Sequence, residues 1–340
     1  MLFVVGPVES ELHHLRGHPE SPTRIEAVMD GILDLRLDSD LVIVPTQPAA
    51  TVELIRVHSP DYLDDLRRFC SIGGGSLEAD TFATPDSWDA ASRAAGAGLV
   101  AIETLRAAGT GLAFVAARPP GHHAVADRPM GFCLMNNIAL AASTLVDLGE
   151  KVLIVDWDVH HGNGTQAMFW DAAEVLYVST HQWPCYPGTG AAAEIGGPLA
   201  SGTTLNVPLP PGATGDVLLR AFDQLVDPAV EEFNPTWVLI SAGFDAHRSD
   251  PLADLALSSG DFAQLAKVVS GYAPGPARTV IFLEGGYDLA ALRSSVSATL
   301  GAIVGSSLAT EKPTSGGPGL EHLQSIAAER QRQLESPKID

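Results

Sequence analysis

The chain has 340 residues, of which 20 are Lys or Arg and 41 are Asp or Glu, so its formal net charge is −21. Its 46% hydrophobic and 18% charged residues are typical of a globular protein and exclude extensive disorder. A surface of this charge repels nucleic-acid phosphates, so we expect no nucleic-acid partner, although the charge can also serve solubility alone.

The cysteine content predicts a reducing compartment. The three cysteines are far apart and form no CxxC pair, which argues against a disulfide framework and against a thiolate zinc site. Residues 1–6 lack the basic start and long apolar core of a signal peptide, and no apolar run approaches the ~20 residues of a membrane helix. We therefore expect a soluble, cytoplasmic protein with no membrane partner.

Seven short apolar runs rich in β-branched residues predict strands. Several are apolar at consecutive positions, which is typical of strands buried on both faces of a parallel sheet. The runs are 2–5, 41–44, 112–116, 152–155, 175–179, 237–241 and 279–283.

Helical patterns separate these strands. Ser21-Pro22 and Ser59-Pro60 each place a capping side chain and a proline at a helix start. Longer helices are expected over 87–108, 133–148 and 214–233. The alternation of strands and helices predicts an α/β fold, a three-layer open sheet of mostly parallel strands with helices on both faces.

The composition changes near residue 310. The stretch EKPTSGGPG resembles a linker, and 320–335 is a polar helix candidate with few apolar positions. We therefore expect one domain over 1–309 and a peripheral polar tail over 310–340. In open α/β sheets, ligands bind outside the carboxyl ends of the strands, so functional residues are sought directly after each strand.

Two strand ends carry possible metal ligands. Asp156, Asp158 and His160 alternate after the strand at 152–155, so an extended backbone places them on one side. Carboxylate and imidazole are both zinc ligands, and Asp245, after the strand at 237–241, could supply a third. The alternative is that these polar residues only cap the helices that follow the strands.

Two further strand ends carry groups suited to hydrolysis. His122 and His123 follow Pro-Pro-Gly after the strand at 112–116, and an imidazole can act as base or acid near neutral pH. Tyr287 follows Gly285-Gly286, and its phenol could donate to a developing oxyanion. The alternatives are two surface or metal-binding histidines and a packed aromatic, so each of these signals gains weight only from the others.

Five segments in this order resemble the histone deacetylase superfamily, which includes zinc-dependent lysine deacetylases and acetylpolyamine amidohydrolases. The resemblance extends from about residue 18 to residue 289 and implies the arginase/deacetylase fold, a single α/β domain around an eight-stranded parallel sheet. The segments are RPPGHHA (118–124), GFCLMNN (131–137), VDWDVHHGNGTQ (155–166), SAGFDAHRSDPL (241–252) and EGGYDL (284–289).

The resemblance implies a role for each matching residue. Asn163 stands where many members have Asp as the partner of the second histidine. The zinc ligands would be Asp158, His160 and Asp245. The tandem histidines would be His122 and His123, with Asp156 as the buried partner of the first, and Tyr287 would be the tyrosine that polarises the carbonyl. An inner potassium site would be formed by Asp156, Asp158, His160 and Ser179.

Other residues are expected around the substrate. Asp80 resembles an aspartate at the pocket rim that holds the substrate backbone in some members of the superfamily. Arg24 resembles an arginine that is buried in the channel of these proteins. Gly285 and Gly286 would support the tyrosine. Gly131 and Phe132, with Trp183 or Tyr186, are expected to line an apolar slot for an alkyl chain, although core packing is the alternative.

The predicted function is zinc-dependent hydrolysis of an acetylated amine to amine and acetate. The substrate would be acetyl-lysine in a protein or an acetylpolyamine, and the ligand set also accepts iron(II). One alternative is an arginase-like ureohydrolase, which needs two metals and an extra aspartate two residues before Asp245. Another is a non-catalytic binder of acylated ligands. The oligomeric state, including a homo-oligomer, is left open.

Overall fold

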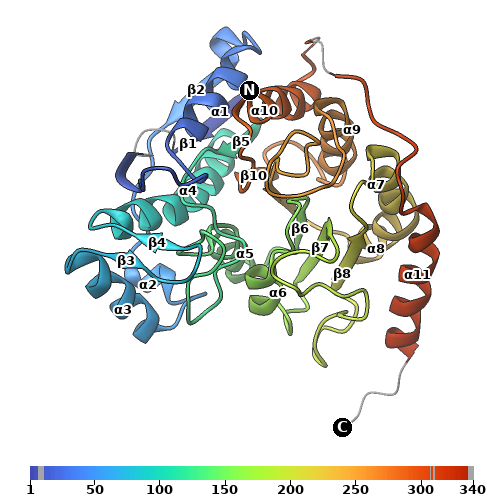
Figure 1. The fold of residues 1–340 in the computed structure, drawn as a ribbon, viewed down its shortest axis with the longest axis horizontal. Coiled ribbons are helices and arrows are strands. Elements are labelled where there is room, and N and C mark those ends of the chain that lie inside the picture. Colours follow the sequence, from blue (N-terminus) through green and yellow to red (C-terminus); the bar gives the residue numbers. More distant parts are fainter. Residues whose placement is uncertain (7–10, 307, 309–310, 336–340) are drawn as a thin grey trace.

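Eight parallel strands form the centre of the computed structural model, which describes residues 1–6, 11–306, 308 and 311–335 (Figure 1). Their order across the sheet is β2-β1-β5-β10-β9-β6-β7-β8, and every neighbouring pair is parallel. This confirms the predicted sheet. The strands are β1 (Leu2–Val5), β2 (Leu41–Val44), β5 (Leu112–Val115), β6 (Val152–Asp156), β7 (Val175–Gln182), β8 (Thr204–Leu209), β9 (Trp237–Ala242) and β10 (Thr279–Leu283), and a separate antiparallel pair is β3 (Gly75–Ser76) and β4 (Phe82–Ala83).

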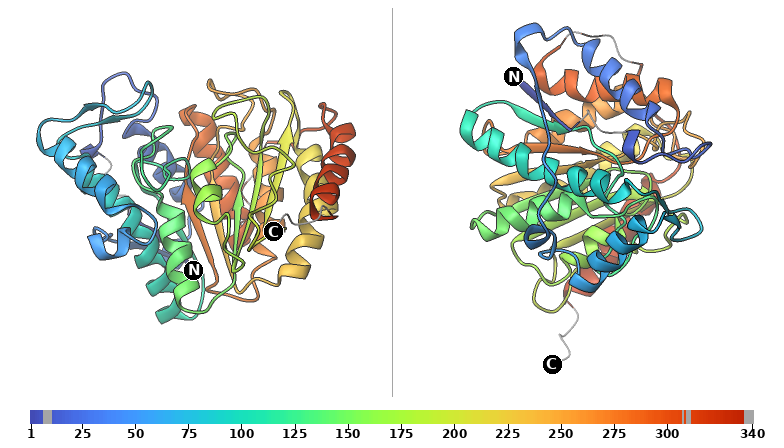
Figure 2. Two further views of the ribbon diagram at one scale, coloured as in Figure 1. Left: turned by 90° about the horizontal axis from the view of Figure 1, so that it is seen from below. Right: turned by 90° about the vertical axis from the view of Figure 1, so that its left-hand side faces the viewer.

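Helices cover both faces of the sheet, as Figure 2 shows. In β1, Leu2 and Val4 pack into one hydrophobic core, whereas Phe3 and Val5 pack into the other, because successive side chains of a strand point to opposite faces. The predicted three-layer architecture is therefore confirmed. The first core includes α1 (Thr23–Leu33), α7 (Gly215–Ala221), α8 (Asp227–Phe233), α9 (Ser259–Ser270) and α10 (Leu289–Val304), and the second α2 (Thr51–Leu54), α3 (Pro60–Ser71), α4 (Ser87–Ala108) and α5 (Asn137–Asp147).

The two predicted Ser-Pro helix starts have different outcomes. Ser59 caps α3, where its hydroxyl accepts the N–H of Tyr62 at 3.2 Å and Pro60 is the first helical residue. For α1 the prediction is wrong, because Pro22 occupies the N-cap position and no side chain caps the helix. Ser21 instead offers its backbone carbonyl to the N–H of Arg24 at 3.1 Å.

Two predicted helices are shorter or less regular than expected. The helix expected from residue 133 begins only at Asn137, and the Asn136 side chain accepts the N–H of Ala139 at 3.0 Å as its cap. The helix expected over 214–233 contains a π-helical segment, η3 (Phe222–Val226), between α7 and α8. Local apolar spacing does not distinguish a π-helical turn from an α-helical one.

Several elements were not predicted from local patterns, among them one strand of the main sheet and two long helices. The strand β8 contains Asn206 and Pro208, which weaken a strand signal, but an edge strand tolerates proline. The helices α9 and α10 pack against each other, and α10 buries small serine and alanine side chains in place of a regular apolar stripe. Short elements are also present at η2 (Asp38–Asp40) and α6 (Asn163–Met168).

The predicted helix in the C-terminal segment is confirmed as α11 (Leu320–Glu335), drawn in red beside β8 in Figure 1. Its Leu323 and Ile326 are buried in the first core. Upstream, the Glu311 carboxylate accepts the N–H of Ser259 at 3.0 Å and lies 2.9 Å from His247 Nε2. Among the residues described, no helix is long and apolar enough to cross a membrane.

Candidate active site

The predicted chemical groups lie beyond the carboxyl ends of four neighbouring strands at the centre of the sheet. The strands β5, β10, β9 and β6 are adjacent and parallel, so their carboxyl ends open on the same edge. The loops after these strands carry His122 and His123, then Tyr287, then Asp245, and then Asp158 and His160.

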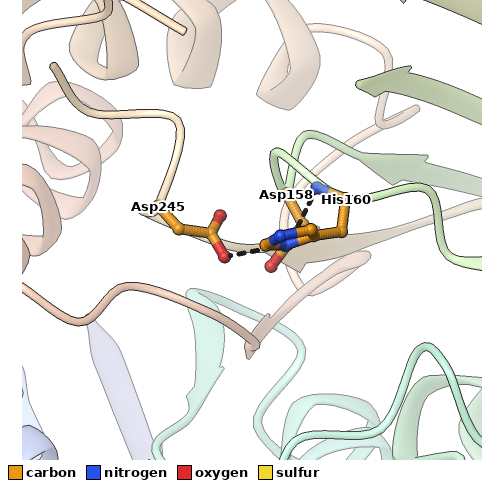
Figure 3. Close-up of side chains that lie close together, drawn as sticks. All are labelled: Asp158, His160 and Asp245. Carbon is orange, nitrogen blue, oxygen red and sulfur yellow. Dashed lines mark hydrogen bonds and ion pairs between the residues drawn. The ribbon is translucent and has the colours of Figure 1, made fainter. Parts of the chain in front are cut away.

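Asp158, His160 and Asp245 converge at this edge, as Figure 3 shows. One ligand atom from each side chain lies within 4.8 Å of the others, and the described residues contain no other such group of His, Cys, Asp or Glu. His160 Nδ1 lies 3.1 Å from Asp158 Oδ1 and 3.3 Å from Asp245 Oδ2. The three predicted ligands are therefore brought together.

The surroundings of these side chains fit a cation. Asp245 Oδ2 is buried, and its 3.3 Å contact with His160 Nδ1 does not have the geometry of a hydrogen bond. A buried carboxylate oxygen without a hydrogen bond is costly unless a positive ion compensates it. A Cβ at Gly285 would lie 1.9 Å from Asp245 Oδ2, and one at Gly243 would lie 2.0 Å from Asp158 Oδ2. Two carboxylates and one imidazole, with glycine backbone on two sides, match the donors of an open divalent metal site.

Backbone N–H groups orient the two carboxylates. Asp158 accepts the N–H of His160 at 2.9 Å through Oδ1 and that of Gly285 at 2.9 Å through Oδ2. Asp245 Oδ1 accepts the N–H of Val159 at 3.0 Å. These contacts link the loops after β6, β9 and β10, so the site depends on strands that are distant in sequence.

His122 is held as a cation by its surroundings. Its Nδ1 lies 3.0 Å from Asp156 Oδ2, which also accepts the hydroxyl of Tyr177 at 3.1 Å. Burial opposes the charged imidazole, but the carboxylates of Asp156, Asp158 and Glu284 outweigh it and raise the pKa of His122 to about 10.

His123 has the opposite character. Burial, together with the neighbouring rings of His122 and His160, lowers the pKa of His123 well below its usual value. Its Nδ1 lies 2.8 Å from Asn163 Oδ1, and the Asn163 amide nitrogen donates to the His123 carbonyl at 3.3 Å. Because Oδ1 can only accept, Nδ1 carries the proton of the neutral ring and Nε2 is left as an acceptor.

A pocket of about 220 Å³ opens onto these groups. The rings of Phe132 and Tyr287 meet edge to face in its wall, with centroids 5.7 Å apart. Of the two aromatic residues offered for the slot, Tyr186 lines this pocket, whereas Trp183 lies in a separate hollow beside α11. The pocket is lined by Asp80, Pro120, His122, His123, Gly131, Phe132, Asp158, His160, Tyr186, Leu252, Gly285 and Tyr287.

Two of the expected supporting residues hold the loop of Tyr287. The buried Arg24 donates from Nε to the carbonyl of Gly286 at 2.7 Å, and its guanidinium carbon lies 4.9 Å from the centre of the Tyr287 ring. Gly286 has φ +118°, which glycine adopts readily. Burial, reinforced by the nearby carboxylates of Asp245 and Asp158, raises the pKa of Tyr287 well above its usual value.

Two residues for which no role was expected, Glu284 and Tyr177, organise the histidines. Glu284 Oε2 accepts the N–H of Gly121 at 2.7 Å and that of His122 at 3.2 Å, so it holds the histidine turn against β10. Tyr177 lies under Asp156 in the middle of β7. The EGGYDL segment could have drawn attention to Glu284, which is its first residue. No sequence signal marks Tyr177, because a tyrosine within a strand looks like an ordinary core residue.

Comparisons with known proteins agree with this geometry. Residues 18–303 match the histone deacetylase domain. The chain belongs to the histone deacetylase family. It is 40% identical over 327 residues to the chloroplastic histone deacetylase 10 of Oryza sativa subsp. japonica, covering 90% of this chain and 73% of that protein. Over 278 residues it is 39% identical to a histone deacetylase-like amidohydrolase of Pseudomonas aeruginosa, with coverage of 80% and 73%.

The fold comparison leads to the same family. The crystal structure of the HDA15 HD domain superposes with a TM-score of 0.88 at 32% sequence identity, covering 97% of both chains. The protein therefore has the arginase/deacetylase fold and is a deacetylase, an enzyme that hydrolyses the amide of an acetylated amine. The binder and ureohydrolase alternatives are set aside on this ground.

Proposed function

We propose that this deacetylase is zinc-dependent and that Asp158, His160 and Asp245 hold the ion. The observation that carries the proposal is the convergence of two buried carboxylates and an imidazole, one carboxylate oxygen having no hydrogen bond. An ion held there would act as a Lewis acid toward the acetyl carbonyl and the attacking water. The same donors accept iron(II), so metal analysis of the purified protein forms part of the test.

His123 is the proposed general base. Its neutral ring leaves Nε2 free to take a proton from water as the water oxygen attacks the acetyl carbonyl. The same imidazole then gives that proton to the amine nitrogen as the C–N bond breaks, releasing acetate and amine. His122 remains protonated and contributes positive charge beside the reacting groups.

Tyr287 is the proposed oxyanion donor. It lines the same pocket as the tandem histidines, and its raised pKa keeps the phenol protonated. Its O–H would donate a hydrogen bond to the oxygen that becomes negative in the tetrahedral intermediate. Arg24, Gly285 and Gly286 support the loop that carries this ring.

The pocket supports an acetylated amine on an alkyl chain as substrate. Phe132 and Tyr186 supply aromatic walls, Gly131 leaves room beside His123, and Asp80 adds a carboxylate to the lining. Acetyl-lysine in a protein and an acetylpolyamine share this chemistry. The test is acetate release from a panel of acetyl-lysine peptides and acetylated polyamines, with a metal-free preparation as control. Failure of every member would reject the proposal.

Three broader expectations remain predictions. A potassium ion is expected near Asp156, Asp158, His160 and Ser179, where β6 and β7 pair Asp156 with Ser179. The division into a catalytic domain over 1–309 and a tail over 310–340 is retained. A cytoplasmic location, with no nucleic-acid partner, follows from the cysteine usage and the −21 charge.

A further inference from the structure

Asp250 connects two loops of the active-site edge through a single carboxylate. It follows Asp245 by five residues and is 7% exposed. Its Oδ2 accepts the N–H of Tyr287 at 2.7 Å and that of Asp288 at 3.4 Å, while Oδ1 accepts the N–H of Leu252 at 3.0 Å. Tyr287 and Leu252 both line the pocket, so two walls depend on the same side chain.

Asp250 lies in the loop after β9, which several backbone hydrogen bonds hold in place. Its N–H donates to the carbonyl of His247 at 2.8 Å, and the N–H of His247 donates to the carbonyl of Phe244 at 3.2 Å. Arg248 donates from its N–H to the carbonyl of Leu257 at 2.8 Å. The loop after β9 is therefore tied at several points, whereas the loop after β10 contains two glycines and needs external support.

The Arg24 guanidinium and the Asp250 carboxyl group hold the peptide group between Gly286 and Tyr287 from its two polar atoms. Arg24 donates to the carbonyl oxygen of this peptide at 2.7 Å, and Asp250 accepts from its N–H at 2.7 Å. A planar peptide held at both polar atoms cannot rotate without losing one of the two contacts. This arrangement restrains the backbone from which the Tyr287 side chain extends.

Capping of α10 does not explain these contacts. Asp288 is the N-cap of α10, and its own carboxylate accepts the N–H of Ala291 at 2.8 Å. The helix therefore has a cap that does not involve Asp250. The shorter contact of Asp250 is with Tyr287, not with the capping residue.

We propose that Asp250 is a positioning residue for the deacetylase reaction, which holds Tyr287 in the orientation needed to reach the oxyanion and holds Leu252 in the pocket wall. This inference rests on the proposed role of Tyr287. A displacement of ~1 Å at a reacting group can cost on the order of 100-fold in rate. Loss of the Asp250 contacts should therefore lower kcat although Asp250 does not touch the substrate.

The test is a double-mutant cycle with Asp250→Asn and Tyr287→Phe in the full-length, metal-loaded enzyme. Asp250→Asn replaces one of the two accepting oxygens by an NH₂ donor, so the contact with Tyr287 or the contact with Leu252 is lost. It should lower kcat by about 10- to 100-fold, with metal content unchanged and a smaller change in KM. In the Tyr287→Phe background, the same substitution should lower kcat by less than about 3-fold, because the hydroxyl that it positions is already absent. Asp250→Ser is the second variant in case the asparagine protein does not fold.

A matched control is Asp216→Asn. Asp216 also accepts a backbone N–H from another loop, that of Gly316 at 3.1 Å, but it does not line the pocket. The Asp216→Asn substitution should leave kcat unchanged both in the natural protein and in the Tyr287→Phe protein. Equal losses of kcat from Asp250→Asn with and without the Tyr287 hydroxyl would overturn this inference and leave the proposed function intact. An unchanged kcat for Tyr287→Phe would instead reject the oxyanion role and, with it, this inference.

Discussion

His123 and Asn163 share a hydrogen bond in which the imidazole Nδ1 lies 2.8 Å from the amide Oδ1. Burial keeps the pKa of His123 well below its usual value, and the neutral Asn163 supports the charged ring too weakly to offset burial. His122, one residue earlier, faces the carboxylate of Asp156 and has its pKa raised to about 10. The pKa values of two adjacent histidines are thereby shifted in opposite directions, that of His123 downward by burial and that of His122 upward by carboxylates.

Asn163→Asp should move the acid limb of the pH–rate profile to higher pH. A carboxylate beside His123 favours the charged imidazole, and an opposite charge at this distance shifts a pKa by about 1–3 units. Since the base must be neutral to accept a proton, activity at low pH should fall. The measurement is kcat/KM against pH for both proteins, and coincident acid limbs would contradict the assignment.

Asp245→Ala should remove both the metal and the activity while the fold persists. Asp245 supplies one of three converging ligand atoms, and the remaining Asp158 and His160 form an incomplete site. Metal content by elemental analysis and acetate release are the two measurements. Asp171→Ala, an exposed aspartate that precedes β7 at the other end of the sheet, serves as the control. Full metal occupancy in Asp245→Ala would show that the ligand set is wrong.

His123→Ala should retain the metal and lose ~10²–10⁴-fold in turnover, because general-base catalysis contributes about that much and the residue is not a ligand. His122→Ala should have the smaller effect, since His122 acts through its charge. Metal content and kcat are measured for both. Small and equal losses would argue against a histidine base.

Tyr287→Phe should lower kcat by ~10²-fold or more with metal content and thermal stability nearly unchanged, because the substitution keeps the ring and removes one donor. Tyr272→Phe is a matched control, since Tyr272 donates its hydroxyl to Asp227 on the helical layer away from the pocket. A near-native kcat in the Tyr287→Phe enzyme would show that Tyr287 is only a packed aromatic residue and does not stabilise the oxyanion.

Glu20 should contribute to stability against acid. Burial favours its neutral form, but Arg118 and Arg24 outweigh burial and lower the pKa of Glu20 to about 2. Its folded pKa lies below its unfolded value, so its contribution is present above about pH 4.5 and is lost as the pH falls toward 2. The difference corresponds to roughly 3 kcal/mol of unfolding free energy.

The measurement for Glu20 is the free energy of unfolding between pH 6 and pH 2. Glu20→Gln should be less stable at neutral pH and should lose less stability on acidification than the natural protein. The exposed Glu103→Gln on α4 is the control and should follow the natural protein throughout. Parallel curves for Glu20→Gln and the natural protein would contradict the prediction.

Local patterns were sufficient where the chemistry is local. The seven predicted strands are present because buried parallel strands are continuous apolar runs in the sequence. Ser59-Pro60 starts a helix because the Ser59 hydroxyl accepts the N–H of Tyr62, only three residues further along the chain. The pattern failed for β8, whose Pro208 is acceptable only at the edge of the sheet. The sequence also left open whether Trp183 or Tyr186 lines the slot, because residue type alone does not show which hollow an aromatic ring enters.

The sequence by itself determined the fold class, the family resemblance and the ligand-bearing strand ends, since each is encoded in a short contiguous segment. Only the tertiary structure decided that Asp250 and Arg24 hold one peptide of the Tyr287 loop, and that Glu284 supports the histidine turn. Arg24 and Gly286 are separated by 262 residues, and Glu284 and Gly121 by 163. Contacts of this kind depend on strand order and register, and these are set by the packing of the whole sheet.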